Sequence, residues 1–148
     1  MATFKKILVP YYGSQACNRA AEKAMELAKE QGAEVTGLKV ISYSFETIVP
    51  SDNLWEAIQD DLHAKAKAAL AGFEAIAKEH EMEVSLEIRD GGTEDEIVKL
   101  ANEIGADLIL MSLGSRVKRL GGFLGKGQQR ISVRTLVSEA PCPVMFVS

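Results

Sequence analysis

The chain has 148 residues, of which 47% are hydrophobic and 26% are charged, and its formal net charge is −4. This length and composition are those of one ordinary globular domain, residues 1–148, and they argue against a disordered chain, a fibre or a disulfide scaffold. The two cysteines, Cys17 and Cys142, lack the paired spacing of a zinc site, so we expect two reduced thiols.

The first third of the chain alternates between strand and helix patterns. Residues 5–10 form a short apolar run that predicts a buried parallel strand, and residues 11–14 predict a tight loop. Because no apolar run here is long enough for a signal peptide or a membrane span, we expect a cytoplasmic protein. The next segment predicts a helix that ends at Gly32 and a strand at residues 35–41. The apolar face of that helix is Ala20, Ala21, Ala24, Leu27 and Ala28.

The middle of the chain predicts a loop, a long helix and a further strand. Residues 42–53 contain Pro50 and show no sustained period, which indicates a loop. Alternation at residues 84–88 predicts a strand exposed on one face, and we interpret residues 90–92 as a plain strand-to-helix turn. Between these segments, apolar residues recur every three or four positions and predict a helix whose stripe lies in the core: Trp55, Ile58, Leu62, Ala66, Ala69, Phe73 and Ile76.

The last third completes the alternation of strands and helices. Thr93 and Glu96 match a capping box and predict the start of a helix that ends at Gly105. Buried strands are predicted at residues 107–111 and 144–147, with a short helix at residues 131–139 between them. Strands separated by helices need crossover connections, so the pattern predicts an α/β domain with a mainly parallel, doubly wound sheet and helices on both faces.

Cations are concentrated in one segment. Residues 112–138 carry six of the 17 lysines and arginines and no carboxylate, which leaves 11 basic against 21 acidic side chains elsewhere. This segment includes several glycines, and it leaves a buried strand at the end where α/β sheets bind ligands. It is therefore either an anion site or a solvated loop. The six cations are Arg116, Lys118, Arg119, Lys126, Arg130 and Arg134.

Three stretches carry a resemblance that covers nearly the whole chain: KKILVP followed two residues later by Gly13 and Ser14, then ADLILMS, then SEAPCPVMFV. With them the chain resembles the universal stress protein family. The resemblance implies a Rossmann-like sheet of five strands, of the adenine nucleotide alpha-hydrolase type, with the first and fourth strands side by side. It also implies a stress-response regulatory protein without catalytic residues. A homodimer is predicted through the apolar last strand: Val144, Met145, Phe146 and Val147.

The resemblance further implies a site for ATP or AMP, with Mg²⁺, between the loops that follow the first and fourth strands. In nucleotide-binding members of the family an acidic residue contacts the nucleotide, and this chain has Tyr12 at that position. A phenol mainly donates a hydrogen bond or stacks, whereas a carboxylate accepts hydrogen bonds. For Gly13 and Ser14 an N-cap at the start of the first helix is a sufficient explanation without a ligand. The positions carried over are Pro10, Tyr12, Gly13, Ser14, Val40, Met111, Ser112, Gly114, Ser115, Arg116, Gly125 and Lys126.

The family's phosphate loop, G-x-x-G, nine residues and then G-[ST], is degenerate in this chain. Counting from Met111 places Ser112 and Ser115 at the two glycines and Gly125 at the first residue of the closing pair. Counting backward from Pro143 places the closing pair at residues 130–131 instead. Both registers remain open, and so does a family member that works as a dimer without nucleotide.

Two other function classes receive less support. A flavin carrier or an adenylating enzyme on this architecture needs a Ser/Thr-rich or S-G-G-x-D-S loop after the first strand, and neither is present. Ser14 and Ser112 have no histidine or aspartate context that would make either a nucleophile. A nucleic-acid binder would interleave aromatic residues with the cations, whereas Phe123 stands alone among them. His63 is interpreted as a surface residue with no partner at the spacing of a metal site.

Overall fold

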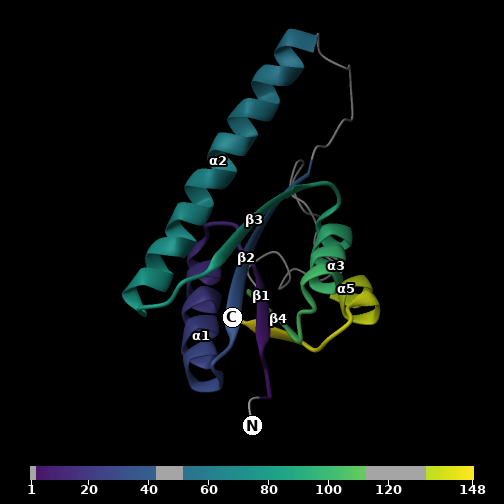
Figure 1. Ribbon diagram of the computed structural model, residues 1–148. Helices are drawn as coiled ribbons and strands as arrows, with labels where there is room; N and C mark the ends of the chain where they lie inside the picture. Colours follow the sequence, from purple (N-terminus) through teal and green to yellow (C-terminus); the bar gives the residue numbers. More distant parts are fainter. Residues whose placement is uncertain (1–2, 43–51, 113–132) are drawn as a thin grey trace.

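The computed structural model describes residues 3–42, 52–112 and 133–148, which form one five-stranded sheet and the helices packed on it (Figure 1). The strand order is β3-β2-β1-β4-β5, and every pairing is parallel. This confirms the predicted doubly wound fold. In chain order the elements are β1 (Lys6–Pro10), α1 (Gln15–Gln31), β2 (Glu34–Ile41), α2 (Asp52–Glu79), β3 (Ser85–Asp90), α3 (Thr93–Ile104), β4 (Leu108–Ser112), α5 (Val133–Glu139) and β5 (Val144–Val147).

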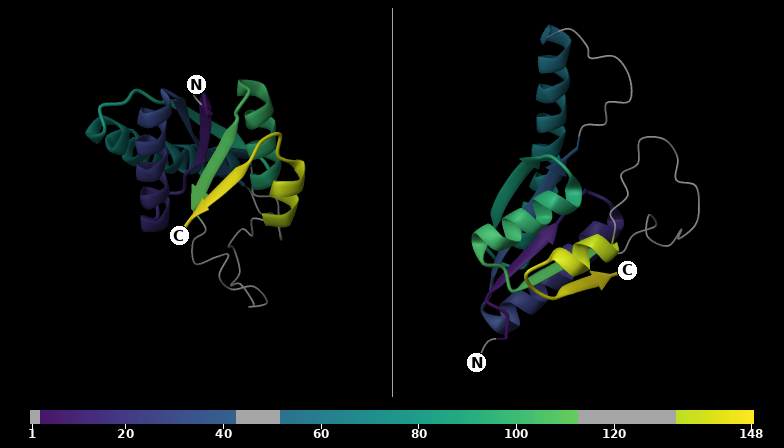
Figure 2. Two further views of the ribbon diagram at one scale, coloured as in Figure 1. Left: turned by 90° about the horizontal axis from the view of Figure 1, so that it is seen from below. Right: turned by 90° about the vertical axis from the view of Figure 1, so that its right-hand side faces the viewer.

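The helices form two layers, one on each face of the sheet. The left view of Figure 2 shows α1 and α2 on one side and α3 and α5 on the other. Each layer has its own core, because alternate residues of the central strands point to opposite faces. Ile7 and Val9 of β1 pack with α1 and α2, whereas Leu8 packs with α3 and α5. β1 is therefore buried on both faces, as its continuous apolar run predicts.

The amino ends of β1 and β4 are joined by one carboxylate. The two oxygens of Asp107, which precedes β4, accept hydrogen bonds from the backbone N–H groups of Lys5 and Lys6 at 2.8 and 3.1 Å. The register beyond this junction pairs Ile7 with Leu108. Asp107 thus aligns two strands that are about a hundred residues apart in sequence.

Three helices end in the same hydrogen-bonded turn. The N–H groups of Ala33, Met82 and Ala106 each donate to the carbonyl five residues earlier, which is the Schellman pattern. The residue before each donor is left-handed: Gly32 and Gly105 both at φ 67°, and Glu81 at φ 57°. The predicted ends at Gly32 and Gly105 are confirmed, while α2 uses a glutamate where glycine is favoured.

The predicted capping box at the start of α3 is wrong. The N-cap is Gly92, which makes no side-chain cap bond, and Thr93 is already inside the helix and 5% exposed. The preceding Gly91 has φ 150°, and an added Cβ there would lie 3.0 Å from Cγ of Glu96. The helix therefore starts one residue earlier than the box predicts, and the side chain of Glu96 packs close to the double-glycine turn.

The predicted core stripe of α2 is confirmed at Ala66 and Phe73, but Ala69 and Ile76 are only half-buried, and the first half of the stripe is wrong. The buried residues are Ala66, Leu70, Phe73 and Ala77, whereas Ile58 is 36% exposed and Trp55 and Leu62 are half-buried. Figure 1 gives the reason: the N-terminal half of α2 extends past the ends of the strands, so there is no sheet beneath it.

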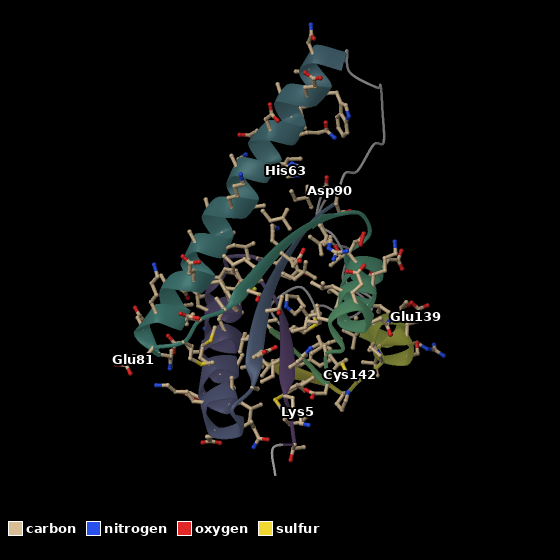
Figure 3. All side chains as sticks on the ribbon, viewed as in Figure 1. Lys5, His63, Glu81, Asp90, Glu139 and Cys142 are labelled. Carbon is tan, nitrogen blue, oxygen red and sulfur yellow. The ribbon has the colours of Figure 1, made fainter. Side chains whose placement is uncertain are left out.

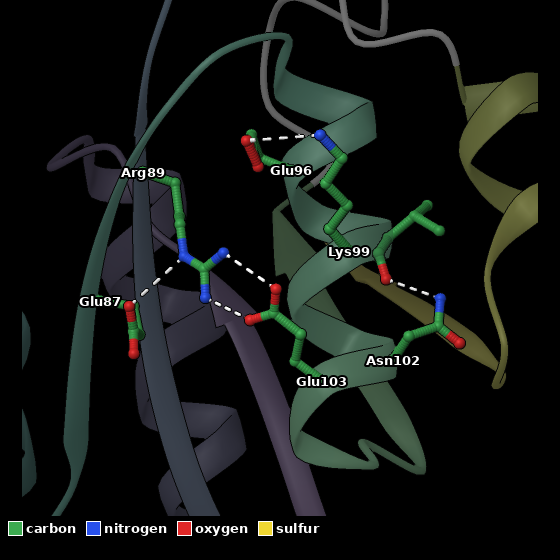
Figure 4. Close-up of polar contacts among 7 residues, drawn as sticks. Glu87, Arg89, Glu96, Lys99, Asn102 and Glu103 are labelled. Carbon is green, nitrogen blue, oxygen red and sulfur yellow. Dashed lines mark hydrogen bonds and ion pairs between the residues drawn. The ribbon is translucent and has the colours of Figure 1, made fainter.

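Charged side chains join β3 to α3 on the surface. Arg89 of β3 donates to both carboxylate oxygens of Glu103 and to Glu87, as Figure 4 shows. The hydrogen bond from Arg89 is the main cause that lowers the pKa of Glu103. This bidentate pair links α3 to the edge strand of the sheet at the surface. Among the described residues, no helix combines the length and the hydrophobicity that crossing a bilayer requires.

Candidate functional site

The carboxyl ends of β1 and β4 are neighbours at the point where the sheet changes direction. Along the chain, β2 and β3 are added on one side of β1, and β4 and β5 are added on the other. Ligands of doubly wound sheets bind in the crevice outside such a switch point. The residues that follow β1, together with Ser112 at the end of β4, therefore form the candidate site.

Tyr11 fixes the path of the chain as it leaves β1. Its N–H donates to the carbonyl of Leu38 at 2.8 Å, and its phenol donates to Oδ1 of Asn18. The ring packs against Phe73 of α2 with 5.4 Å between centroids and is 2% exposed. Burial raises the pKa of the Tyr11 phenol, so it stays a neutral donor. Tyr11 thus belongs to the core and holds the loop that follows it.

The turn into α1 requires glycine and a capping side chain. Gly13 has φ 86°, a left-handed conformation that glycine adopts without strain. Ser14 is the N-cap of α1, and its Oγ accepts a hydrogen bond from the N–H of Cys17 at 3.2 Å. This confirms the N-cap interpretation of Ser14. The turn leads directly into the first helical turn at the mouth of the crevice.

Cys17 connects the two halves of the site. Its Sγ lies 3.4 Å from the N–H of Tyr12, which donates to it, and 3.5 Å from Oγ of Ser112. The thiol is buried, with the residue 2% exposed. Cys17 therefore brings the loop after β1 into contact with the end of β4. Sequence reasoning gave Cys17 no role, although its position three residues after the N-cap Ser14 was a usable signal, because it places the side chain in the first turn of α1.

Lys39 is a second residue that sequence reasoning missed. It follows Leu38, whose register partner is Pro10, so it comes next to the chain leaving β1. Its Nζ lies 5.0 Å from the centroid of the Tyr12 ring, within the range of a cation–π contact. The two side chains pack together on the β1–β2 side of the site. A cation that stabilises the ring in this way also adds positive charge beside the crevice.

The other predicted site residues fall into two groups. Pro10, Val40 and Met111 are buried, and the side chains of Val40 and Met111 pack in the core beneath α3 and α5. Only their main-chain atoms are suitable for contacting a ligand. The remaining five lie outside the described residues: Gly114, Ser115, Arg116, Gly125 and Lys126.

Comparison with known proteins identifies the family. The chain matches the universal stress protein family over residues 3–148. It is 31% identical over 144 residues to the universal stress protein MJ0531 of Methanocaldococcus jannaschii, covering 97% of this chain and 82% of that protein. The chain belongs to the universal stress protein family. The resemblance seen in the sequence is thereby confirmed.

Solved structures of universal stress proteins have the same fold. A universal stress protein in complex with cAMP is 18% identical, with a TM-score of 0.75 and coverage of 99% of both chains. A protein of the family from Arabidopsis thaliana with AMP bound is 21% identical, with a TM-score of 0.64 and coverage of 97% of this chain and 90% of that one. At these identities the likeness establishes the shared fold.

His63, which the sequence predicts to lie on the surface of this universal stress protein, makes a contact that the sequence did not reveal. His63 of α2 has a partner: its Nε2 lies 3.4 Å from Oδ1 of Asp90 at the end of β3, while its Nδ1 lies 2.8 Å from the carbonyl of Gln59 (Figure 3). The histidine is 41% exposed and connects α2 to the carboxyl edge of the sheet. Within the described ranges, no cluster of three or more His, Cys, Asp or Glu residues is placed to hold a metal ion.

Proposed function

We propose that this chain is a regulatory module of the universal stress protein family that binds an adenine nucleotide at the crevice between β1 and β4. The observation that carries the proposal is the contact of 3.5 Å between Sγ of Cys17 and Oγ of Ser112. It joins two segments 95 residues apart at the switch point, where a doubly wound sheet binds its ligands.

The chemistry of the surrounding groups supports an anionic ligand. The crevice begins at the N-terminus of α1, whose dipole favours negative charge, and Lys39 adds a cation beside Tyr12. Arg116 and Lys126, which follow Ser112 in the sequence, are cations that favour phosphate oxygens. Relatives of the same fold have AMP or cAMP bound. In our proposal these residues hold the phosphate, and Tyr12 with the main chain at Val40 holds the nucleoside.

Three further features belong to this proposal. The module acts by binding rather than by catalysis and works in the cytoplasm. Because Tyr12 stands where binding members have a carboxylate, Mg²⁺ would reach this site only with the phosphates of ATP. The module forms a homodimer through β5, an edge strand on which Met145 is 39% exposed.

A second candidate function rests on Tyr12 itself. A half-buried phenol packed under Lys39 occupies the place of the family's acidic residue and removes an acceptor for the ribose or the adenine amino group. This departure supports a universal stress protein that acts through its dimer surface without nucleotide.

Calorimetric titration of AMP and of ATP with Mg²⁺ into the purified chain separates the two candidates. The test variant is Arg116→Ala with Lys126→Ala, and the matched control is Lys23→Ala with Lys78→Ala. The control removes the same charge from exposed sites on α1 and α2. We expect micromolar binding to the natural chain and the control, and at least about tenfold weaker binding to the test variant.

The absence of heat with both nucleotides would reject the nucleotide proposal in favour of the second candidate. Equal loss of binding in the test and control variants would show a general charge effect instead of a phosphate site.

Replacement of Met145 with Lys is expected to convert the dimer to a monomer, as measured by light scattering. An unchanged mass would refute the β5 interface.

A further inference from the structure

The N-terminal half of α2 is an apolar helix face without sheet beneath it. All the buried residues of α2 lie from Ala66 onward. Before that point the helix rises past the carboxyl ends of the strands, as Figures 1 and 2 show. His63, through its contact with Asp90, marks where the helix leaves the sheet. We call residues 53–62 the projecting segment.

The apolar stripe continues through this segment. Leu54, Ile58 and Leu62 recur every four residues and lead into Ala66, the first buried residue of the same stripe. Leu54 is 54% exposed and Ile58 is 36% exposed, and Trp55 lies half-buried beside them. Two large aliphatic side chains on one exposed helix face, continuous with the core stripe, are typical of a site that binds another helix.

Charge selects the kind of partner. Glu56, Asp60 and Asp61 are exposed and flank the stripe, and residues 53–62 contain no lysine or arginine. The next cation, Lys65, is paired with Asp61 at 3.0 Å. Two copies of this segment side by side would bring carboxylates together, and anionic lipid would also be repelled. A basic surface, by contrast, gains attraction along the whole segment.

We propose that the projecting segment is a docking surface for a basic amphipathic helix of a partner protein. The partner helix carries leucine-like residues at three- and four-residue spacing, which pack on Leu54, Ile58 and Leu62, and lysines or arginines that meet Glu56 and Asp60. This interface lies on α2, apart from the nucleotide crevice and from β5. It gives the regulatory module a surface through which to contact its target.

Trp55, the only tryptophan of the chain, reports directly on this surface. The probe is a synthetic helical peptide of about 18 residues, with leucines on one face and lysines beside them. Titrated into the full chain, it is expected to shift Trp55 fluorescence to the blue as the indole loses contact with water. Affinity is expected to fall as salt is added, because exposed charges are screened. A peptide with glutamate in place of every lysine is expected not to bind.

Variants locate the contact. Ile58→Asp is expected to weaken peptide binding at least about tenfold. The change removes the aliphatic side chain that the peptide covers in the complex, and it puts a carboxylate in its place within a segment that is already acidic. The matched control is Val137→Asp, which makes the same kind of change on α5 at a residue 52% exposed. It is expected to bind as the natural chain does. Circular dichroism checks that both variants keep their helical content.

Four outcomes overturn the proposal. The first is the absence of a Trp55 shift at peptide concentrations up to about 1 mM. The second is equal binding of the lysine and glutamate peptides, and the third is equal weakening by Ile58→Asp and Val137→Asp. The fourth is a Trp55 shift produced without peptide, either by raising the protein concentration or by adding anionic vesicles. It would assign the surface to a second copy or to a membrane.

Discussion

Replacing Gly37 with alanine tests how the core supports the loop after β1. Gly37 lies in β2 beneath α2, and an added Cβ would be 2.6 Å from both Cδ1 and Cε1 of Phe73. Such a separation does not occur between real atoms, so the ring must move. Phe73 is completely buried and packs on the ring of Tyr11, so it has little space to move into.

The expected loss follows from opposing terms. Overpacking a well-filled core costs about 1–3 kcal/mol. Alanine also restricts the unfolded chain, which returns about 0.4–1 kcal/mol. We therefore expect Gly37→Ala to lower the free energy of unfolding by about 1–2 kcal/mol. Because Phe73 supports Tyr11, we also expect weaker nucleotide binding in the same variant.

Urea denaturation at fixed protein concentration measures the loss, and a double-mutant cycle with Phe73→Leu tests its cause. A smaller side chain at position 73 leaves room for the new methyl group. The double variant should therefore lose about 1 kcal/mol less free energy of unfolding than the two single losses added together. The reasoning is refuted if Gly37→Ala unfolds within about 0.5 kcal/mol of the natural chain, or if the two losses simply add.

Three more predictions concern the helix ends and the titratable groups. Glu81→Gly should raise the free energy of unfolding by about 0.5–1 kcal/mol, because glycine removes the strain of the left-handed turn that ends α2. Gly32→Ala should lower the free energy of unfolding by about as much. Equal melting temperatures of the two variants would contradict this prediction. Since the folded-state pKa of Glu103 is lowered, the stability that it contributes is present above the ordinary glutamate pKa and is lost as the pH falls through the lowered value. Glu103→Gln should therefore flatten the acid side of a plot of melting temperature against pH, and an unchanged slope contradicts it. Burial raises the pKa of the Cys142 thiol, so iodoacetamide should modify Cys142 more slowly in the folded chain than in urea, as measured by mass spectrometry, and equal rates would contradict this.

The fold could be predicted because its signals are local and agree with one another. The apolar run of β1 and the glycine after α1 each identify one element through backbone or packing rules that hold in any context. The first half of α2 shows the limit of this reasoning. Periodicity identifies an apolar helix face, but it does not say whether anything lies against that face. Ile58 and Phe73 therefore look alike in the sequence and differ in burial.

The site was less predictable because it depends on contacts between distant segments. The N-cap at Ser14 could be inferred from its neighbours, whereas the contact between Cys17 and Ser112 exists only once β1 and β4 are paired. The prediction of a capping box at Thr93 was wrong for a related reason. A capping box was expected from four residues, but the N-cap is Gly92, which lies just outside them.

The position of β1 in the middle of the sheet has a consequence for the order of folding. During synthesis β1 emerges from the ribosome first. β2 can then pair with β1, and β3 with β2, once the first part of the chain has emerged. The other side of β1 has no partner until Leu108–Ser112 has been made. During that interval the nascent chain presents an apolar strand edge, which is a hazard for aggregation. The ligand crevice, which needs β4, is accordingly absent from the early intermediate and is completed late in synthesis.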